Sequence, residues 1–207
     1  MIRYNLKHKL FFLTKILLIY FIFFLKSYGD NINSDNKLII LGPNEAPVKI
    51  KIFSSLTCSY CANFHIKIVP EIKKYYVDKN KVQLIFIDFP LDQAAFNASK
   101  LLHCLDKKNQ FTYLDNIYKN QNKWTSGSNI KEININLKNM VKNLGISNKK
   151  FDKCLDDEEI SDKILSDRIE GQKKYSINAT PTVVINEKKY EGSFDYQSIK
   201  EKIEKLI

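Results

Sequence analysis

Two cysteines, Cys58 and Cys61, lie three residues apart within the stretch SSLTCSYCANFH. A pair with this spacing can cycle between dithiol and disulfide, close a small structural loop, or supply two ligands to a metal ion. The chain of 207 residues has four cysteines, and the other two are Cys104 and Cys154. The chemistry of the first pair therefore depends on the elements that position it and on the compartment of the chain.

The elements around the pair follow one another as strand, helix and strand. Residues 48–55 alternate apolar side chains with lysines, which predicts a strand. Apolar residues then recur at helical spacing over residues 62–76, with a kink expected at Pro70. Residues 82–89 are almost continuously apolar, as in a strand that is buried on both faces of a sheet. This order predicts a βαβ unit with the cysteines at its first turn.

The two thiols are expected to differ at this turn. Cys58 falls at the helix N-terminus, where free backbone N–H groups and the helix dipole favour a thiolate. Cys61 lies one turn later, where it can resolve a mixed disulfide. We therefore predict redox chemistry with Cys58 as the nucleophile and Cys61 as the resolving thiol, and we expect Ser59 and Tyr60 to contact the substrate.

Two other uses of the pair stay open at this point. The cysteines could form a small structural disulfide, or they could bind zinc, because Cys58, Cys61 and His65 form a C-x-x-C-x-x-x-H pattern. A structural zinc site needs four ligands, usually from a second close pair, and Cys104 and Cys154 are far apart in sequence. We therefore expect no metal site, and we expect His65 on a helix face or in the core.

The rest of the chain adds helices in the middle and strands near the end. Residues 37–42 predict a further short strand, and Asp92 is expected to cap the first helix of a helical block. Patterns of helical spacing also cover residues 110–122, 130–144 and 147–176. Strands return at residues 180–186 and 188–193, and residues 195–207 predict an amphipathic helix. The sheet is therefore expected to contain pieces from both ends of the chain.

A proline lies directly before one of these late strands. Such a residue blocks a sheet unless it takes the first position of the strand, as Pro181 does here. The CxxC pair at the start of the first helix, Thr180–Pro181 before a late strand, and the inserted helices together resemble the DsbA-like thiol:disulfide oxidoreductases of the thioredoxin superfamily. The resemblance implies an α/β thioredoxin-like fold with an inserted helical domain. The expected domains are a thioredoxin-like domain at residues 30–91 and 166–207 and a helical domain at residues 92–165.

The resemblance also implies roles for residues and shows two departures. Pro181 is expected to be cis and to lie against the cysteine pair, leaving the backbone of Thr180 free to bind an extended substrate segment. No cofactor is implied, because the sulfur atoms carry the electrons. Many family members have a histidine where this chain has Tyr60, and a buried acid where it has Ile52. The proton acceptor for Cys61 is therefore unidentified from the sequence.

The second pair needs its own explanation. If Cys58 and Cys61 form the active pair, Cys104 and Cys154 are left to form a structural disulfide. Closing a loop of this length would stabilise the fold by about 4 kcal/mol in the chain-entropy model. Two independent free thiols are the alternative, but these are disfavoured in an oxidising compartment.

The N-terminal residues predict that the chain is exported. A basic start is followed by an apolar run at residues 16–25 and by the small residues Ser27 and Gly29. This layout is typical of a signal peptide, here residues 1–29. A membrane anchor at residues 10–25 is the alternative, although a span needs about 20 apolar residues.

The charge of the chain does not indicate a nucleic-acid partner. The formal net charge is +10, and residues 1–29 hold five of the 33 basic residues and none of the 23 acids, so the rest of the chain carries +5. The lysines are spread along the sequence among acids and asparagines, whereas binding to phosphate needs clustered charge.

These observations predict an exported oxidase of the bacterial periplasm that donates its disulfide to secreted proteins and is reset by a membrane redox partner. We expect a monomer, because residues 30–47 are too few for a separate dimerisation domain, which needs about 50 residues. A reductase or isomerase of the same fold is one alternative. A copper-binding or chaperone-like module without catalysis is another, although methionine occurs only at Met1 and Met140.

Overall fold

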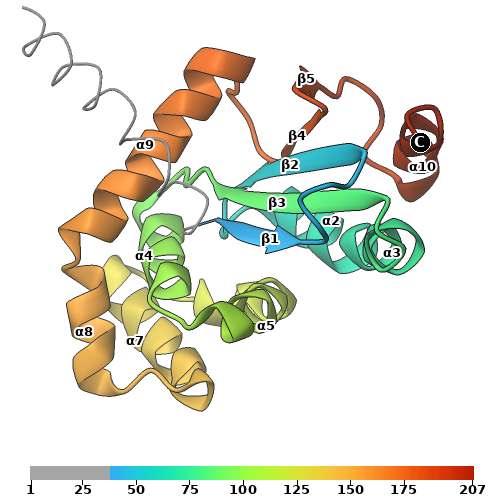
Figure 1. Ribbon diagram of the computed structural model, residues 1–207. Coiled ribbons are helices and arrows are strands. Elements are labelled where there is room, and N and C mark those ends of the chain that lie inside the picture. Colours follow the sequence, from blue (N-terminus) through green and yellow to red (C-terminus); the bar gives the residue numbers. More distant parts are fainter. Residues whose placement is uncertain (1–37) are drawn as a thin grey trace, which may run out of the picture. The chain divides into compact units, whose positions relative to one another are not determined.

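The computed structural model describes residues 38–207, and within them residues Ile39–Ile207 form one compact unit (Figure 1). The predicted signal peptide, residues 1–29, and the alternative anchor, residues 10–25, lie outside the described residues. Among the helices of residues 38–207, none is both long and apolar enough to span a membrane.

A five-stranded sheet lies at the centre of this unit, with the strand order β1-β3-β2-β4-β5. The strands are β1 (Ile39–Leu41), β2 (Val48–Ser54), β3 (Val82–Asp88), β4 (Thr182–Ile185) and β5 (Lys188–Lys189). The two central strands, β2 and β3, run parallel, and every other pair is antiparallel. The sheet is therefore assembled from both ends of the described chain, as the sequence predicted.

The central strands follow the predicted burial. Val48, Ile50 and Ile52 of β2 are buried on one face of the sheet, while Phe53 is buried on the other. Strand β3 is buried along almost its whole length. The last strand is shorter than residues 188–193 predicted: β5 ends at Lys189, and Gly192 then lies against the ring of Tyr190.

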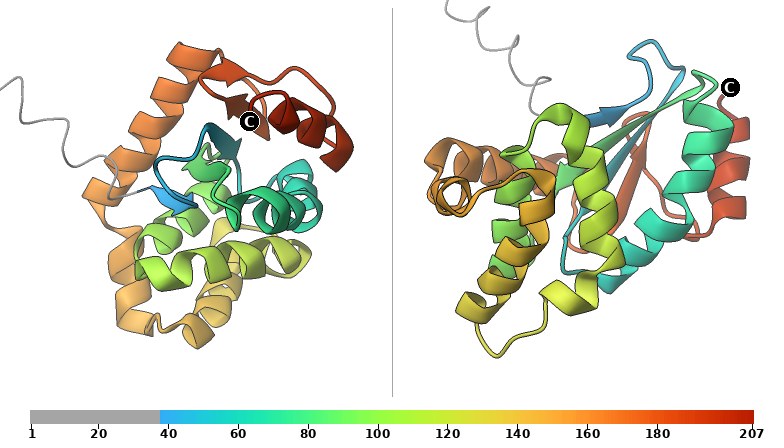
Figure 2. Two further views of the ribbon diagram at one scale, coloured as in Figure 1. Left: turned by 45° about the vertical axis from the view of Figure 1, so that its right-hand side comes forward. Right: turned by 90° about the horizontal axis from the view of Figure 1, so that it is seen from below.

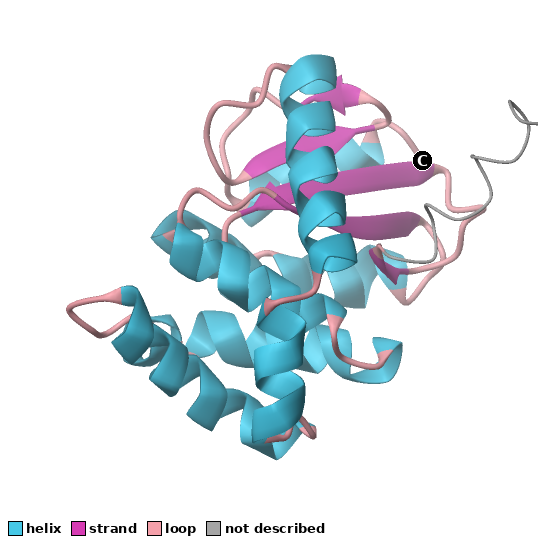
Figure 3. Cartoon of the chain, turned by 90° about the vertical axis from the view of Figure 1, so that its left-hand side faces the viewer, coloured by secondary structure: helices cyan, strands magenta, loops and turns pink. Residues whose placement is uncertain are grey.

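Helices cover both faces of the sheet (Figures 2 and 3). One face carries the C-terminal helix and the elements that follow the cysteine pair: α2 (Ser59–Lys67), α3 (Val69–Ile72), the π-helical turn η2 (Lys73–Val77) and α10 (Tyr196–Glu204). The expected kink is present, because α2 ends at Lys67 and Pro70 lies in the first turn of α3.

The long helix α9 (Glu158–Tyr175) crosses the other face of the sheet (Figure 3). It packs closely on β2 at Gly171, where an added Cβ would lie 2.7 Å from Cε1 of Phe53. That separation is shorter than real contacts allow, so a larger residue here would force the Phe53 ring or the helix to shift.

A block of helices lies between β3 and α9 in the sequence. It consists of α4 (Gln93–His103), α5 (Lys107–Lys119), α6 (Gln121–Trp124), α7 (Ile130–Val141), the 3-10 turn η3 (Lys142–Leu144) and α8 (Asn148–Leu155). Asp92 caps α4 as predicted, since its Oδ1 accepts a hydrogen bond from the Ala95 N–H at 2.8 Å. Trp124 and Tyr113 are fully buried within the block.

The predicted continuous helix at residues 147–176 is wrong. The structure has two helices there, α8 and α9, because Asp157 begins a new helix by accepting a hydrogen bond from the Ile160 N–H at 3.0 Å. Helix α9 also runs through residue 165, the predicted end of the inserted domain. The division of the chain at that residue stays a prediction.

Candidate active site

Cys58 is the N-cap residue of α2, directly after the turn that follows β2. Its Sγ accepts a hydrogen bond from the Cys61 N–H at 3.4 Å and donates one to the carbonyl of Thr180 at 3.3 Å. The side chain is only partly buried. A thiolate at this position would therefore be held by the free N–H groups of the helix and would be open to a substrate.

The turn before Cys58 is held by residues of the helical block. Gln121 donates from Nε2 to the carbonyls of Leu56 at 2.8 Å and Cys58 at 3.1 Å. Thr57 donates from Oγ1 to Asp92 at 2.6 Å. Neither contact is visible in the sequence, since no local pattern connects Gln121 to a turn 65 positions away.

Two opposing effects set the pKa of the Cys58 thiol. Burial raises it, but the backbone N–H groups of Cys61 and Tyr60 and the neighbouring Thr180 hydroxyl, which can donate to a thiolate, outweigh burial and hold the pKa below its ordinary value. In the dithiol described here, Thr180 Oγ1 is buried and has no hydrogen-bond partner within residues 38–207. Its proton is therefore free for a thiolate.

Cys61 has the opposite character. Its side chain is 2 % exposed, and burial, with a smaller contribution from the charge of Cys58, raises its pKa to about 12. The pair thus holds a thiol that ionises more readily than an ordinary cysteine beside a thiol that stays protonated at neutral pH. A partner bound to the first sulfur could be displaced by the second, which is the chemistry of disulfide exchange.

The remaining predicted substrate residues surround the first sulfur. The Thr180–Pro181 peptide bond is cis, and the Thr180 carbonyl lies beside Cys58 directly before β4. Ser59 and Tyr60 are exposed, and the Tyr60 side chain is 76 % accessible. The fold thus brings Thr180 to the cysteine pair from a position 122 residues away. That Ser59, Tyr60, Thr180 and Pro181 contact a substrate stays a prediction.

His65 lies in the core, as one of the two expectations had it. Its Nε2 is 2.7 Å from Oδ1 of Asp115, and its ring packs 4.8 Å from that of Tyr118, centroid to centroid. Burial lowers the pKa of this histidine, although Asp115 acts in the opposite direction. Within residues 38–207, no three or more His, Cys, Asp or Glu side chains are grouped so as to hold a metal ion.

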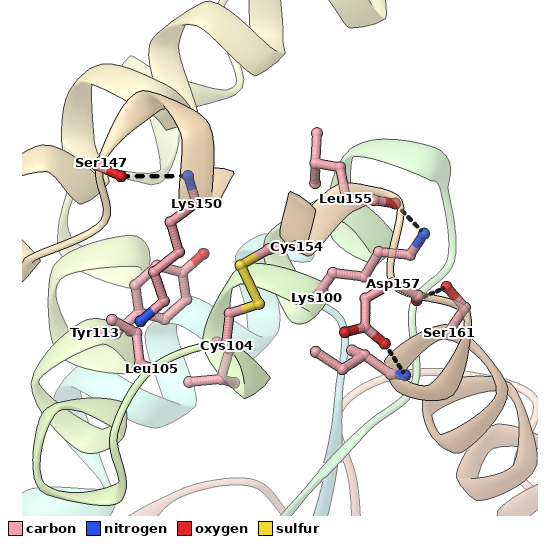
Figure 4. The surroundings of a disulfide bond; sticks show 12 residues. Lys100, Cys104, Leu105, Tyr113, Ser147, Lys150, Cys154, Leu155, Asp157 and Ser161 are labelled. Carbon is pink, nitrogen blue, oxygen red and sulfur yellow. Dashed lines mark hydrogen bonds between the residues drawn. A yellow bond between two sulfur atoms is a disulfide. The ribbon is translucent and has the colours of Figure 1, made fainter. Parts of the chain in front are cut away.

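The second cysteine pair forms a disulfide between the end of α4 and α8 (Figure 4). The Cα atoms of Cys104 and Cys154 are 6.0 Å apart, and Cys154 is almost completely buried. Beside the bridge, Lys100 of α4 donates from Nζ to the carbonyl of Leu155 at 2.7 Å (Figure 4). The bridge therefore joins two helices that an ordinary hydrogen bond also connects.

Comparisons with known proteins agree with this geometry. The thioredoxin family model matches residues 34–205. A probable disulfide bond formation protein D of Bacillus anthracis is 30% identical over 172 residues, which cover 81% of this chain and 77% of that protein. A putative protein-disulfide oxidoreductase of Rickettsia bellii is 26% identical, over 88% of this chain and 69% of that protein.

Solved structures lead to the same family. The crystal structure of alpha-DsbA1 from Wolbachia pipientis superimposes with a TM-score of 0.73 at 28% identity, covering 82% of this chain and 90% of that one. The site is consistent with this likeness, because the pKa of Cys58 at the start of α2 is lowered and that of Cys61 is raised. The chain therefore belongs to the thioredoxin family, as a DsbA-like thiol:disulfide oxidoreductase.

Proposed function

We propose that this protein is an exported oxidase that donates the Cys58–Cys61 disulfide to reduced proteins in the bacterial periplasm. The observation that carries the proposal is the contrast between the two thiols, because Cys58 is accessible with a lowered pKa and Cys61 is buried with a raised one. A sulfur with a low pKa leaves readily from a mixed disulfide, which favours passing the disulfide on.

The exchange has two steps. A substrate thiolate attacks Cys58 of the oxidised pair, forming a mixed disulfide and releasing Cys61, which takes up a proton. A second substrate thiolate then attacks the substrate sulfur of the mixed disulfide, and Cys58 leaves as a thiolate. Two electrons thus pass from the substrate to the protein, whose own sulfur atoms replace a cofactor.

The surroundings of Cys58 support a way of binding the substrate. The backbone of Thr180 beside Cys58 can pair with an extended segment, with Pro181 adjacent and Ser59 and Tyr60 exposed at the rim. After each cycle the dithiol is reoxidised by a membrane redox partner. Export rests on the basic, apolar and small residues of positions 1–29. The protein acts as a monomer.

The test compares two substrates with the same purified protein. Oxidised protein should oxidise reduced, unfolded ribonuclease quickly and reactivate scrambled ribonuclease poorly, and light scattering should give the mass of one chain. Equal activity on both substrates would make the protein an isomerase. Tight copper binding without any exchange would make it a binding module.

A further inference from the structure

Gln121 is a buried side chain of the helical block whose hydrogen bonds go to the turn of the cysteine pair. It is the first residue of α6, and its Nε2 donates to the carbonyls of Leu56 at 2.8 Å and Cys58 at 3.1 Å. The short helix is itself anchored, because Trp124 is fully buried and donates from Nε1 to the Ile117 carbonyl at 2.9 Å. The amide is therefore held in place against the residue that carries the accessible sulfur.

The carbonyl of Cys58 takes part in the geometry of the helix N-terminus. It accepts from the Ala62 N–H at 3.0 Å, which is the first hydrogen bond of α2, and from the Gln121 amide. Cys58 has the extended backbone of an N-cap residue, with φ of −77° and ψ of 121°. The direction of its carbonyl depends on ψ, and the same angle sets where the N–H groups of α2 lie relative to Sγ. The Gln121 contact therefore fixes the angle on which stabilisation of a thiolate depends.

The carbonyl of Leu56 is a second point of support in the same turn. Leu56 is buried, and within residues 38–207 its carbonyl accepts from no backbone N–H. The Gln121 amide thus provides the partner that a buried carbonyl needs. The helical block also holds the turn through Asp92, which accepts from Thr57. Of these two links to the block, only that from Gln121 reaches Cys58.

We propose that Gln121 is a positioning residue for disulfide exchange, because its amide keeps the first turn of α2 in the geometry that stabilises the Cys58 thiolate. Gln121 is uncharged and acts through the backbone: while it holds the carbonyls, the N–H groups of Tyr60 and Cys61 stay directed at Sγ. A more stable thiolate favours the dithiol over the disulfide. The contact should therefore increase the fraction of Cys58 that is ionised and make the disulfide a stronger oxidant.

The test measures the ionisation of Cys58 in the reduced protein. Iodoacetamide labels the purified dithiol protein over a range of pH, and mass spectrometry of peptides gives the rate at Cys58. In Gln121→Met the side chain keeps its length but donates no hydrogen bond. The midpoint of the pH profile should rise by about one unit, which is a roughly tenfold smaller thiolate fraction below the midpoint.

A second measurement follows the same effect in the redox equilibrium. In buffer above both midpoints, Gln121→Met at equilibrium with glutathione should have a ratio of disulfide to dithiol about tenfold higher than the wild type. A variant that is folded but merely less stable changes neither this ratio nor the midpoint. The two measurements therefore distinguish positioning of the site from general support of the fold.

Gln110→Met is the matched control. Gln110 of α5 is 8 % exposed, the same fraction as Gln121. Its Nε2 also donates to two carbonyls, those of Leu102 and Leu105, each at 3.4 Å. The substitution removes the same kind of amide from the helical block without touching the cysteine turn, so the midpoint and the redox ratio should stay those of the wild type.

Two results would overturn the proposal. One is a wild-type midpoint and redox ratio in Gln121→Met, and the other is an equal change in Gln121→Met and Gln110→Met. If Gln121→Met does not fold, Gln121→Asn decides, since its amide is one methylene shorter and cannot reach both carbonyls. An unchanged midpoint in that variant would also overturn the role of Gln121.

The inference rests on the proposed role of Cys58 as the nucleophile, and the same labelling separates the two. If Cys61 reacts first in the wild type, or if Cys58 titrates as an ordinary cysteine, the role of Cys58 and this proposal are both overturned. If Cys58 reacts first in the wild type and keeps its midpoint in Gln121→Met, only the role of Gln121 is overturned.

Discussion

The two cysteine pairs of this protein consist of the same side chains but lie in different surroundings. Cys58 and Cys61 are separated by two residues at the start of α2, and one sulfur is accessible while the other is buried. Cys104 and Cys154 are 50 positions apart and join α4 to α8. The first pair adjoins free N–H groups and an open surface, whereas the second is packed between helices.

On the roles proposed above, this difference explains how one chain can hold a reactive pair and an inert pair. The N-terminus of α2 and the Thr180 hydroxyl lower the pKa of one sulfur, and burial raises the pKa of its neighbour. The proposed reactivity thus comes from the difference between the pKa values of the Cys58 and Cys61 thiols. In the bridge between α4 and α8, neither sulfur caps a helix N-terminus, so the bond has only to hold the helices together.

The largest expected effect is the loss of exchange when the first sulfur is removed. Cys58→Ser should reduce oxidation of an unfolded substrate to the uncatalysed rate, because the nucleophile is gone. Cys61→Ser should accumulate mixed disulfides that gel electrophoresis resolves. A Cys104→Ser and Cys154→Ser double variant is the control, and loss of exchange there would place the second pair in the redox cycle.

The two sulfurs of the active pair should also react at different pH. Because the pKa of Cys58 lies below its ordinary value and that of Cys61 is about 12, iodoacetamide should label Cys58 in mildly acidic buffer and leave Cys61 unmodified. Mass spectrometry of peptides measures both labels in one sample. Equal labelling, or labelling of Cys61 first, would contradict the assigned roles.

The disulfide between the helices should matter for stability alone. Replacing Cys104 and Cys154 by alanine should lower the free energy of unfolding by about 4 kcal/mol, from the loss of loop closure in the unfolded chain. Chemical denaturation measures the change. The bridge should also stay oxidised at potentials that reduce the active pair, since structural bridges have lower potentials.

A smaller effect is expected from the Thr180 hydroxyl. Thr180→Val should raise the pKa of Cys58 and slow its alkylation in mildly acidic buffer by about tenfold, because a hydrogen bond to the thiolate is lost. Thr182→Val is a matched control, since the Thr182 hydroxyl donates to the Ala179 carbonyl and not to sulfur. If alkylation of Cys58 slowed equally in both variants, the effect would come from a shift of the backbone at residues 179–182 and not from the lost Thr180 hydroxyl.

Local patterns predicted much of the fold and the centre of the site. The alternation in residues 48–55, the apolar run in residues 82–89 and the cap at Asp92 each correspond to an element of the structure. The location of the cysteine pair followed from the same patterns, because a pair placed after a strand and before a helix must lie at the helix N-terminus. Periodicity and capping act over a few residues, so they can be read from sequence.

The ends of some helices and strands were not predicted, although they depend on only a few residues. The break between α8 and α9 lies at Asp156 and Asp157, where helical spacing continues on both sides. Strand β5 ends after two residues, although the predicted strand ran to residue 193. Periodic patterns locate helices and strands but do not show where each one ends, and at Asp157 a single capping side chain sets the start of α9.

The sequence by itself determined where the Cys58–Cys61 pair lies and the order of the elements that carry it. Only the tertiary structure decided what surrounds the pair: Thr180 reaches Cys58 across 122 positions, and Gln121 holds the turn across 63. Asp88 meets His103 only because α4 packs against the end of β3. Such contacts depend on which faces of distant elements are buried together, and the packing of the whole core selects those faces.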